Sequence, residues 1–211
     1  MNLASIKENH NIEKRIAITP EIAKKYISLG FNLTLANNYG VHLGFGDQDY
    51  KNLGVNFVND EEEIIKNSHI VIQLGLPDEE KLSFFKENQT LIGSLNTFLN
   101  KEKLNNLKSK KINCFSLEML PRITRAQSMD ILSSQANLAG YKAVVEAFQV
   151  YERAIPMMMT AAGTIPAAKV LVVGAGVAGL QAIATAKRMG AVVFATDVRM
   201  ASKEQVESLG G

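Results

Sequence analysis

The chain has 211 residues, of which 46% are hydrophobic and 21% are charged, a composition typical of a globular protein with one large or two small domains. Its 23 basic and 21 acidic residues are mixed along the sequence and give a formal net charge of +2, so no nucleic-acid-binding surface is expected. The single cysteine, Cys114, cannot form an internal disulfide, which favours a reducing, cytoplasmic compartment.

Short apolar runs alternate with amphipathic stretches through the first half of the chain, a pattern that predicts an α/β domain with a mainly parallel sheet. Strands are expected at 3–6, 31–36, 69–74, 90–94 and 111–116. A helix is predicted at 20–29, because Thr19 and Pro20 favour a helix start and Gly30 favours its end. The acidic run at 60–63 is interpreted as a first helical turn rather than a metal cluster, since the helix dipole stabilises carboxylates there.

The pattern changes after Glu118. Residues 119–130 break the alternation of strands and helices, and a long helix is then predicted at 133–154 from apolar residues at helical spacing, ended by Pro156. We interpret this helix as a connector, which divides the chain into a first domain at 1–135, a connecting helix and linker at 136–164, and a second domain at 165–211. The three methionines at 157–159 are expected to pack in a core or between domains.

A glycine-rich turn opens the second domain, between a predicted strand at 170–173 and an alanine-rich helix that extends to residue 189. The turn residues are Gly174, Ala175, Gly176, Val177, Ala178 and Gly179. A second strand at 191–196 leads to Asp197, close to the roughly 20-residue spacing expected between such a turn and a ribose-binding acid. Strand, turn, helix and acid together predict a dinucleotide-binding site, and the stretch 170–186 is too short and too rich in glycine and alanine for a membrane span.

Each residue type in this turn has a physical reason. Gly174 would permit the tight turn, Gly176 would let the backbone approach a pyrophosphate, and Gly179 would allow close packing of helix on strand. Asp197 would accept hydrogen bonds from the adenosine ribose and repel a 2′-phosphate, which favours NAD over NADP. The nearby Arg199 weakens that preference slightly.

Two long segments carry a specific resemblance to a known family. They are Pro121-Arg122-Ile123-Thr124-Arg125-Ala126-Gln127-Ser128-Met129-Asp130, which continues to Tyr141, and Pro156-Met157-Met158-Met159-Thr160-Ala161-Ala162-Gly163-Thr164. Both resemble the NAD(H)-binding alpha subunits of proton-translocating nicotinamide nucleotide transhydrogenases. Weaker similarity at 15–20 and 44–50 extends to the wider family that also contains alanine dehydrogenase.

The resemblance implies an oxidoreductase in which hydride passes directly between NAD(H) on this subunit and NADP(H) on a partner domain or subunit, coupled to proton translocation. The implied partners are a membrane domain and an NADP(H)-binding beta subunit, with a homodimer of the full-length subunit. The chain would then lie in the cytoplasm, peripheral to the inner membrane through those partners.

By motif position, the resemblance places Arg122, Gln127, Asp130 and Ser133 in the loop that holds the nicotinamide and its ribose. Hydride transfer needs no acid or base, only two rings held close together in a dry site. Gln127 would fix the carboxamide or ribose, and Arg122 and Asp130 would pair to orient the loop. Without the resemblance, an exposed loop with a surface ion pair is the favoured interpretation of these residues.

Three alternatives remain open: an amino-acid dehydrogenase of the alanine dehydrogenase type, a non-enzymatic NAD-binding module, and an inactive fragment. A keto-acid enzyme needs an acid/base group, and the lysine and histidine of alanine dehydrogenases would align with Gly75 and Asn96 here. His10, His42 and His69 are scattered and are interpreted as structural, so no metal site is expected.

The C-terminal end leaves room for only one helix, at 202–208, after Asp197. A dinucleotide-binding fold normally contains two βαβαβ halves, and its ligand crosses between them. The expected fold is therefore α/β, with two Rossmann-like domains with parallel sheets joined by a long helix, the second truncated. We expect the 211-residue chain alone to be inactive.

Overall fold

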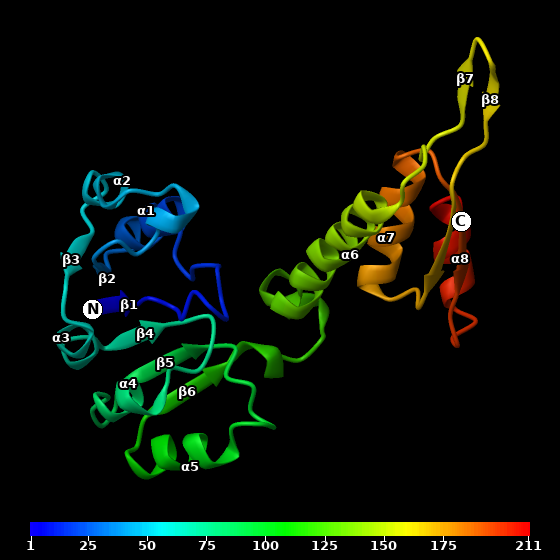
Figure 1. The fold of residues 1–211 in the computed structure, drawn as a ribbon. Coiled ribbons are helices and arrows are strands. Elements are labelled where there is room, and N and C mark those ends of the chain that lie inside the picture. The colour runs from blue at the N-terminus through cyan, green and yellow to red at the C-terminus, as the bar shows by residue number, and fades with distance from the viewer. The chain divides into compact units, whose positions relative to one another are not determined.

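The computed structural model describes residues 1–211 and divides them into two units, Met1–Met129 and Asp130–Gly211 (Figure 1). The first unit is built on a six-stranded sheet in the order β3-β2-β1-β4-β5-β6. Its strands are β1 (Asn2–Ser5), β2 (Asn32–Ala36), β3 (Asn56–Val58), β4 (Ile70–Ile72), β5 (Thr90–Gly93) and β6 (Asn113–Ser116). Every pairing in this sheet is parallel, which confirms the predicted architecture.

The predicted strands are all present, and β3 is an addition that the sequence pattern did not reveal. Its three residues include the exposed Asn56 and two half-buried side chains, too short a run to produce a periodic signal. From β1 the chain builds outward to β3 and then returns to the other side of β1 at β4. The strand order therefore reverses between β1 and β4, a position where ligands of open α/β sheets commonly bind.

Helices connect these parallel strands: α1 (Pro20–Ser28), α2 (Asp47–Lys51), α3 (Glu61–Lys66), α4 (Glu79–Ser83) and α5 (Lys101–Ser109). The Thr19 hydroxyl accepts a hydrogen bond from the N–H of Ile22 at the start of α1, and Gly30 follows that helix with a φ of 85°. Asp60 caps α3 by accepting from the Glu62 N–H. The acidic run at 60–63 is thus the start of a helix, as predicted.

The sheet is buried on both faces. Leu3 belongs to one hydrophobic cluster with Leu33 and Leu35, whereas its neighbour Ala4 belongs to another with Val71. Successive strand side chains point to opposite faces, so neighbouring residues supply different cores. The unit also contains three short 3-10 turns: η1 (Val41–Leu43) follows β2, and η2 (Leu117–Met119) and η3 (Thr124–Met129) follow β6.

The second unit is a βαβ arrangement with one additional long helix. Its elements are α6 (Ile131–Val150), β7 (Met158–Thr160), β8 (Gly163–Ile165), β9 (Lys169–Val173), α7 (Val177–Arg188), β10 (Val192–Thr196) and α8 (Ser202–Ser208). β9 and β10 pair in parallel through the crossover helix α7. The sheet of this Rossmann-like unit has only these two strands, so the predicted truncation is present.

The long helix predicted as a connector packs within the second unit. Val144 of α6 lies in one cluster with Ala182, Ile183 and Ala186 of α7, and these contacts place α6 on the C-terminal side of the unit boundary at Met129. No helix in the chain combines the length and the apolarity that crossing a membrane requires.

The methionine run at 157–159 differs from its predicted position in a core. It enters an antiparallel hairpin in which β7 pairs only with β8, and Met159 is 82% exposed (Figure 1). A two-stranded hairpin has no layer packed on it, so its side chains remain open to solvent. The exposed Leu171 and Phe194 show that one face of the β9–β10 pair is also uncovered.

Candidate functional site

The glycine-rich turn lies between β9 and α7, and its three glycines are required for three different physical reasons. Gly174 has a φ of 95°, a conformation that favours glycine. A β-carbon on Gly179 would overlap the carbonyl oxygen of Gly174, so helix and turn can approach this closely only without a side chain. A β-carbon on Gly176 would meet no atom within 4 Å. Its side of the turn is therefore open to an approaching molecule.

The turn also presents hydrogen-bond donors. Gly176 is the N-cap of α7 and supplies no side-chain cap, and the first helical hydrogen bond runs from the Leu180 N–H to the Gly176 carbonyl. The N–H groups of Val177, Ala178 and Gly179 therefore have no partner inside the helix. Unpaired N–H groups and the positive end of the helix dipole attract phosphate. Open space at Gly176 and donors beside it fit a pyrophosphate.

Asp197 follows β10 and reaches back to this turn. Its Oδ2 accepts a hydrogen bond from the N–H of Ala175 at 2.7 Å, so the acid and the turn are joined directly. The parallel pairing of β9 with β10 places their carboxyl ends side by side, with Val173 opposite Thr196. The structure thus brings the predicted ribose-binding acid to the predicted phosphate-binding turn.

Arg199 holds the same carboxylate. Its Nε donates to Asp197 Oδ1 at 3.0 Å and its Nη2 donates to Oδ2 at 3.0 Å, while its backbone N–H donates to Oδ1 at 2.8 Å. These hydrogen bonds, with that from Ala175, hold the pKa of Asp197 far below the usual range for a carboxyl. The same pair raises the pKa of Arg199. The sequence showed Arg199 near the acid but not this closed geometry, for which the Asp-Val-Arg spacing is the available signal.

The remaining predicted site residues fall on either side of the unit boundary. Arg122 is exposed ahead of η3, and Gln127 lies exposed within η3. Asp130 is the N-cap of α6, and its carboxylate accepts from both the Ser133 N–H at 2.9 Å and the Ser133 hydroxyl at 2.7 Å. The structure therefore joins Asp130 to Ser133. The predicted pairing of Arg122 with Asp130 stays a prediction.

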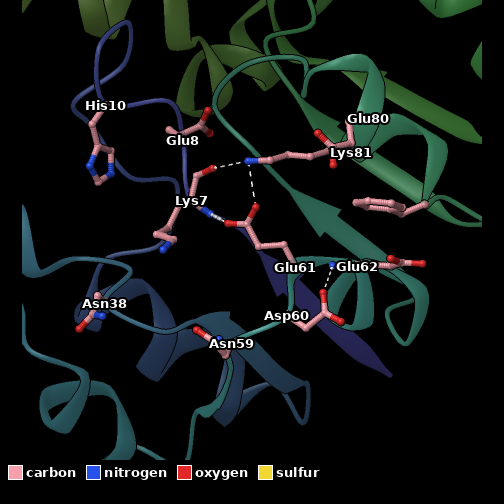
Figure 2. Close-up of a pocket in the computed structure, with 11 residues that line it drawn as sticks. Lys7, Glu8, His10, Asn38, Asn59, Asp60, Glu61, Glu62, Glu80 and Lys81 are labelled. Carbon is pink, nitrogen blue, oxygen red and sulfur yellow. Dashed lines mark hydrogen bonds and ion pairs between the residues drawn. The ribbon is translucent and has the colours of Figure 1, made fainter.

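A second candidate site is a cavity of about 790 Å³ in the first unit (Figure 2). It lies at the carboxyl ends of the strands around the reversal of strand order, and the sequence analysis did not find it. The lining comprises Lys7, Glu8, His10, Asn38, Asn59, Asp60, Glu61, Glu62, Glu80, Lys81 and Phe84. The signal that could have revealed it is the position of polar residues directly after successive strands.

An ion pair crosses this cavity. The Lys81 ammonium lies 2.9 Å from Glu61 Oε2 and 3.4 Å from the Lys7 carbonyl oxygen, while Glu61 Oε1 accepts from the Lys7 N–H (Figure 2). Five carboxylates and two lysines line the space, so it would repel the phosphates of a nucleotide. The dinucleotide site is therefore assigned to the glycine turn and not to this larger cavity.

A buried polar network lies beside the cavity at the end of β1. The Ser5 hydroxyl donates to Gln73 Oε1 at 2.8 Å and lies 2.8 Å from the Tyr39 hydroxyl. Burial raises the pKa of Tyr39 to about 12. Glu8 accepts from the Leu74 N–H at 2.7 Å, yet burial dominates and raises the pKa of this carboxyl. The network fixes the carboxyl ends of β1 and β4 rather than offering a free reactive group.

Gly75 and Asn96, at the positions of the alanine dehydrogenase lysine and histidine, follow β4 and β5. Asn96 has a φ of 50°, and its carbonyl oxygen accepts from the Leu99 and Asn100 N–H groups. Asparagine tolerates this left-handed conformation, which explains its presence in a turn. Neither residue has a side chain that could act as an acid or base at neutral pH.

Two family models together match most of the chain. "Alanine dehydrogenase/PNT, N-terminal domain" matches residues 5–139, and "Alanine dehydrogenase/PNT, C-terminal domain" matches residues 143–211. The chain is 47% identical over 216 residues to the first of the separate chains that make up the NAD(P) transhydrogenase alpha subunit of Rhodospirillum rubrum. That comparison covers all of this chain and 56% of the relative, so the chain spans about half the relative's length.

Solved structures give the same result. The crystal structure of a transhydrogenase from Sinorhizobium meliloti matches with a TM-score of 0.92 and 46% identity, over 99% of this chain and 63% of that one. An L-alanine dehydrogenase structure matches with a TM-score of 0.84 over 100% of this chain and 58% of that one. At 23% identity, this second likeness concerns the fold alone.

Proposed function

Because the chain belongs to the alanine dehydrogenase/pyridine nucleotide transhydrogenase family, we propose that it is the NAD(H)-binding portion of a proton-translocating NAD(P) transhydrogenase alpha subunit. The observation that carries this proposal is the direct hydrogen bond between Asp197 and the Ala175 N–H, which joins the acid to the glycine turn. The identity of 47% to a transhydrogenase alpha subunit chain favours this member of the family.

The proposed site binds NAD(H) through the backbone of the glycine turn. The N–H groups of Val177, Ala178 and Gly179 receive the pyrophosphate, and Gly176 leaves the space that it occupies. Asp197 accepts the ribose hydroxyls and disfavours a 2′-phosphate by charge repulsion. NAD(H), when bound, supplies the hydride or accepts it at its nicotinamide ring.

The loop residues position that ring in the proposed reaction. Gln127 fixes the carboxamide or ribose through its side-chain amide, and the Asp130–Ser133 hydrogen bonds fix the helix start that follows the loop. Arg122 completes the loop by pairing with Asp130 when nucleotide is bound. None of these groups moves a proton, because direct hydride transfer between two nicotinamides needs only orientation and exclusion of water.

The partners follow from the same proposal. NADP(H) is held by a beta subunit, a membrane domain carries the coupled protons, and the full-length alpha subunit forms a homodimer. The chain is then cytoplasmic and associates with the inner membrane through these subunits. Alanine dehydrogenase is the alternative activity, and Gly75 and Asn96 at its lysine and histidine positions disfavour it.

One assay separates the two activities. The complete assembly is tested for reduction of an NADP analogue by NADH, beside NADH oxidation with pyruvate and ammonia. Analogue reduction without pyruvate turnover supports the transhydrogenase, and the reverse result supports alanine dehydrogenase.

The nucleotide site is tested by Asp197→Ala in the complete subunit. The loss of a charged acceptor for two ribose hydroxyls should weaken NADH binding about tenfold or more, measured by calorimetry. Unchanged affinity in a folded variant would remove Asp197 from the site.

A further inference from the structure

The acceptor capacity of Asp197 is fully used in the structure. A carboxylate has two oxygens with about four acceptor positions. The Ala175 N–H and the Arg199 Nη2 donate to Oδ2, and the Arg199 backbone N–H and Nε donate to Oδ1. A ribose therefore cannot bind Asp197 without displacing one or more of these donors.

The four donors differ in how easily they can leave. The N–H groups of Ala175 and Arg199 belong to the backbone, and Ala175 is buried within the glycine turn, so their release would distort the turn. The Arg199 side chain is 61% exposed, whereas that of Asp197 is 10% exposed. Exposed ion pairs contribute little net free energy. The guanidinium is thus the group that can yield.

The guanidinium also matches the ligand it would yield to. Its Nε and Nη2 form a fork of two donors on the two carboxylate oxygens, and a ribose presents two neighbouring hydroxyl donors. Nη2 further lies 3.4 Å from the Ala175 carbonyl oxygen, so the side chain extends over the turn itself.

We propose that Arg199 is a latch on the nucleotide site: its guanidinium occupies the acceptor positions on Asp197 that ribose hydroxyls take, and nucleotide binding opens the pair. This inference rests on the proposed function, because it assumes that the turn and Asp197 bind the adenosine diphosphate half of a dinucleotide. Arg199 keeps the acid ionised and oriented in the free protein. It also lowers the affinity by competing with the ligand.

The test uses 5′-ADP as the probe, with binding to the 211-residue chain measured by NMR titration at millimolar concentrations. Arg199→Gln removes the fork and one positive charge. Lys203→Gln is the matched control, because Lys203 is exposed, pairs only loosely with Glu207 at 3.7 Å and carries the same charge. Arg199→Lys retains the charge but cannot form the planar fork.

Arg199→Gln should bind 5′-ADP about two- to fivefold more tightly than Lys203→Gln, the range expected from an exposed ion pair. Arg199→Lys should bind more tightly than the unaltered chain, and ADP should shift the Arg199 Nε–H resonance of that chain.

Equal or weaker binding by Arg199→Gln than by Lys203→Gln would overturn the latch and leave the proposed function intact. Absence of ADP binding to every variant would also overturn it, since a latch requires a competing ligand. NADH binding by the complete subunit, tested through Asp197→Ala, would then still decide the proposed function.

Discussion

Gly140 of α6 packs directly against the backbone carbonyl of Ala178 in α7, so closely that a β-carbon on Gly140 would overlap that oxygen. The contact lies in the first turn of the helix that follows the glycine-rich turn. It brings α6 onto the same helix that presents its N-terminus to the nucleotide. The glycine in the middle of a 20-residue helix is therefore required by packing between helices.

Gly140→Ala should destabilise the second unit although alanine is the better helix former. The helix propensity gain is about 1 kcal/mol. Forcing a methyl group into a backbone contact costs roughly 1–3 kcal/mol or more, so overpacking prevails. Hydrogen exchange of α6 and α7 amides should accelerate. Gly75→Ala, where a β-carbon meets no atom within 4 Å, is the control, and equal protection in both variants would contradict the packing role.

Gly176→Ala and Gly179→Ala should fail in opposite ways. At Gly176 the added methyl group enters open space, so the fold should persist while NADH affinity of the complete subunit falls. At Gly179 the methyl group would overlap the Gly174 carbonyl, so thermal stability should fall first. Melting curves and NADH titrations of both variants check this. Equal melting temperatures would show that the turn relaxes to accept a side chain at residue 179.

Gln127→Ala in the complete enzyme should lower the hydride-transfer rate far more than NADH affinity. The proposed amide contact orients the ring, and misorientation costs rate rather than binding. Stopped-flow rates and equilibrium titrations measure the two effects. Ser128→Ala, an exposed neighbour in the same turn, is the control. Comparable losses in rate and affinity would argue against a positioning role.

Glu8→Gln should change how stability depends on pH. Burial raises the pKa of Glu8 above its ordinary value of 4.5, so the folded state binds the proton more tightly than the unfolded chain. Its contribution is fully present below pH 4.5 and is lost as the pH rises through the folded value. The variant does not titrate and should gain stability relative to the unaltered protein across that window. Urea unfolding at pH 4 and pH 7 measures the difference, and a constant difference would contradict the shift.

The sequence alone determined the elements whose causes are local. Thr19, Pro20 and Gly30 specify the limits of α1, because caps and left-handed residues act within a few positions. The glycine turn and Asp197 were found because their spacing reflects the length of one crossover helix. The three-residue β3 was missed, because so short a strand is fixed by its neighbour β2 and not by its own pattern.

Only the tertiary structure decided which distant residues meet. The strand order brings Glu61 and Lys81 together across a cavity, since parallel pairing joins segments far apart in the chain. The need for Gly140 depends on a helix almost forty residues later, and no periodicity within α6 reveals it. Asp197 was predicted as an acceptor for ribose, whereas its closure by Arg199 depends on side-chain geometry. Sequence spacing therefore locates the site, and packing decides which of its groups are free to act.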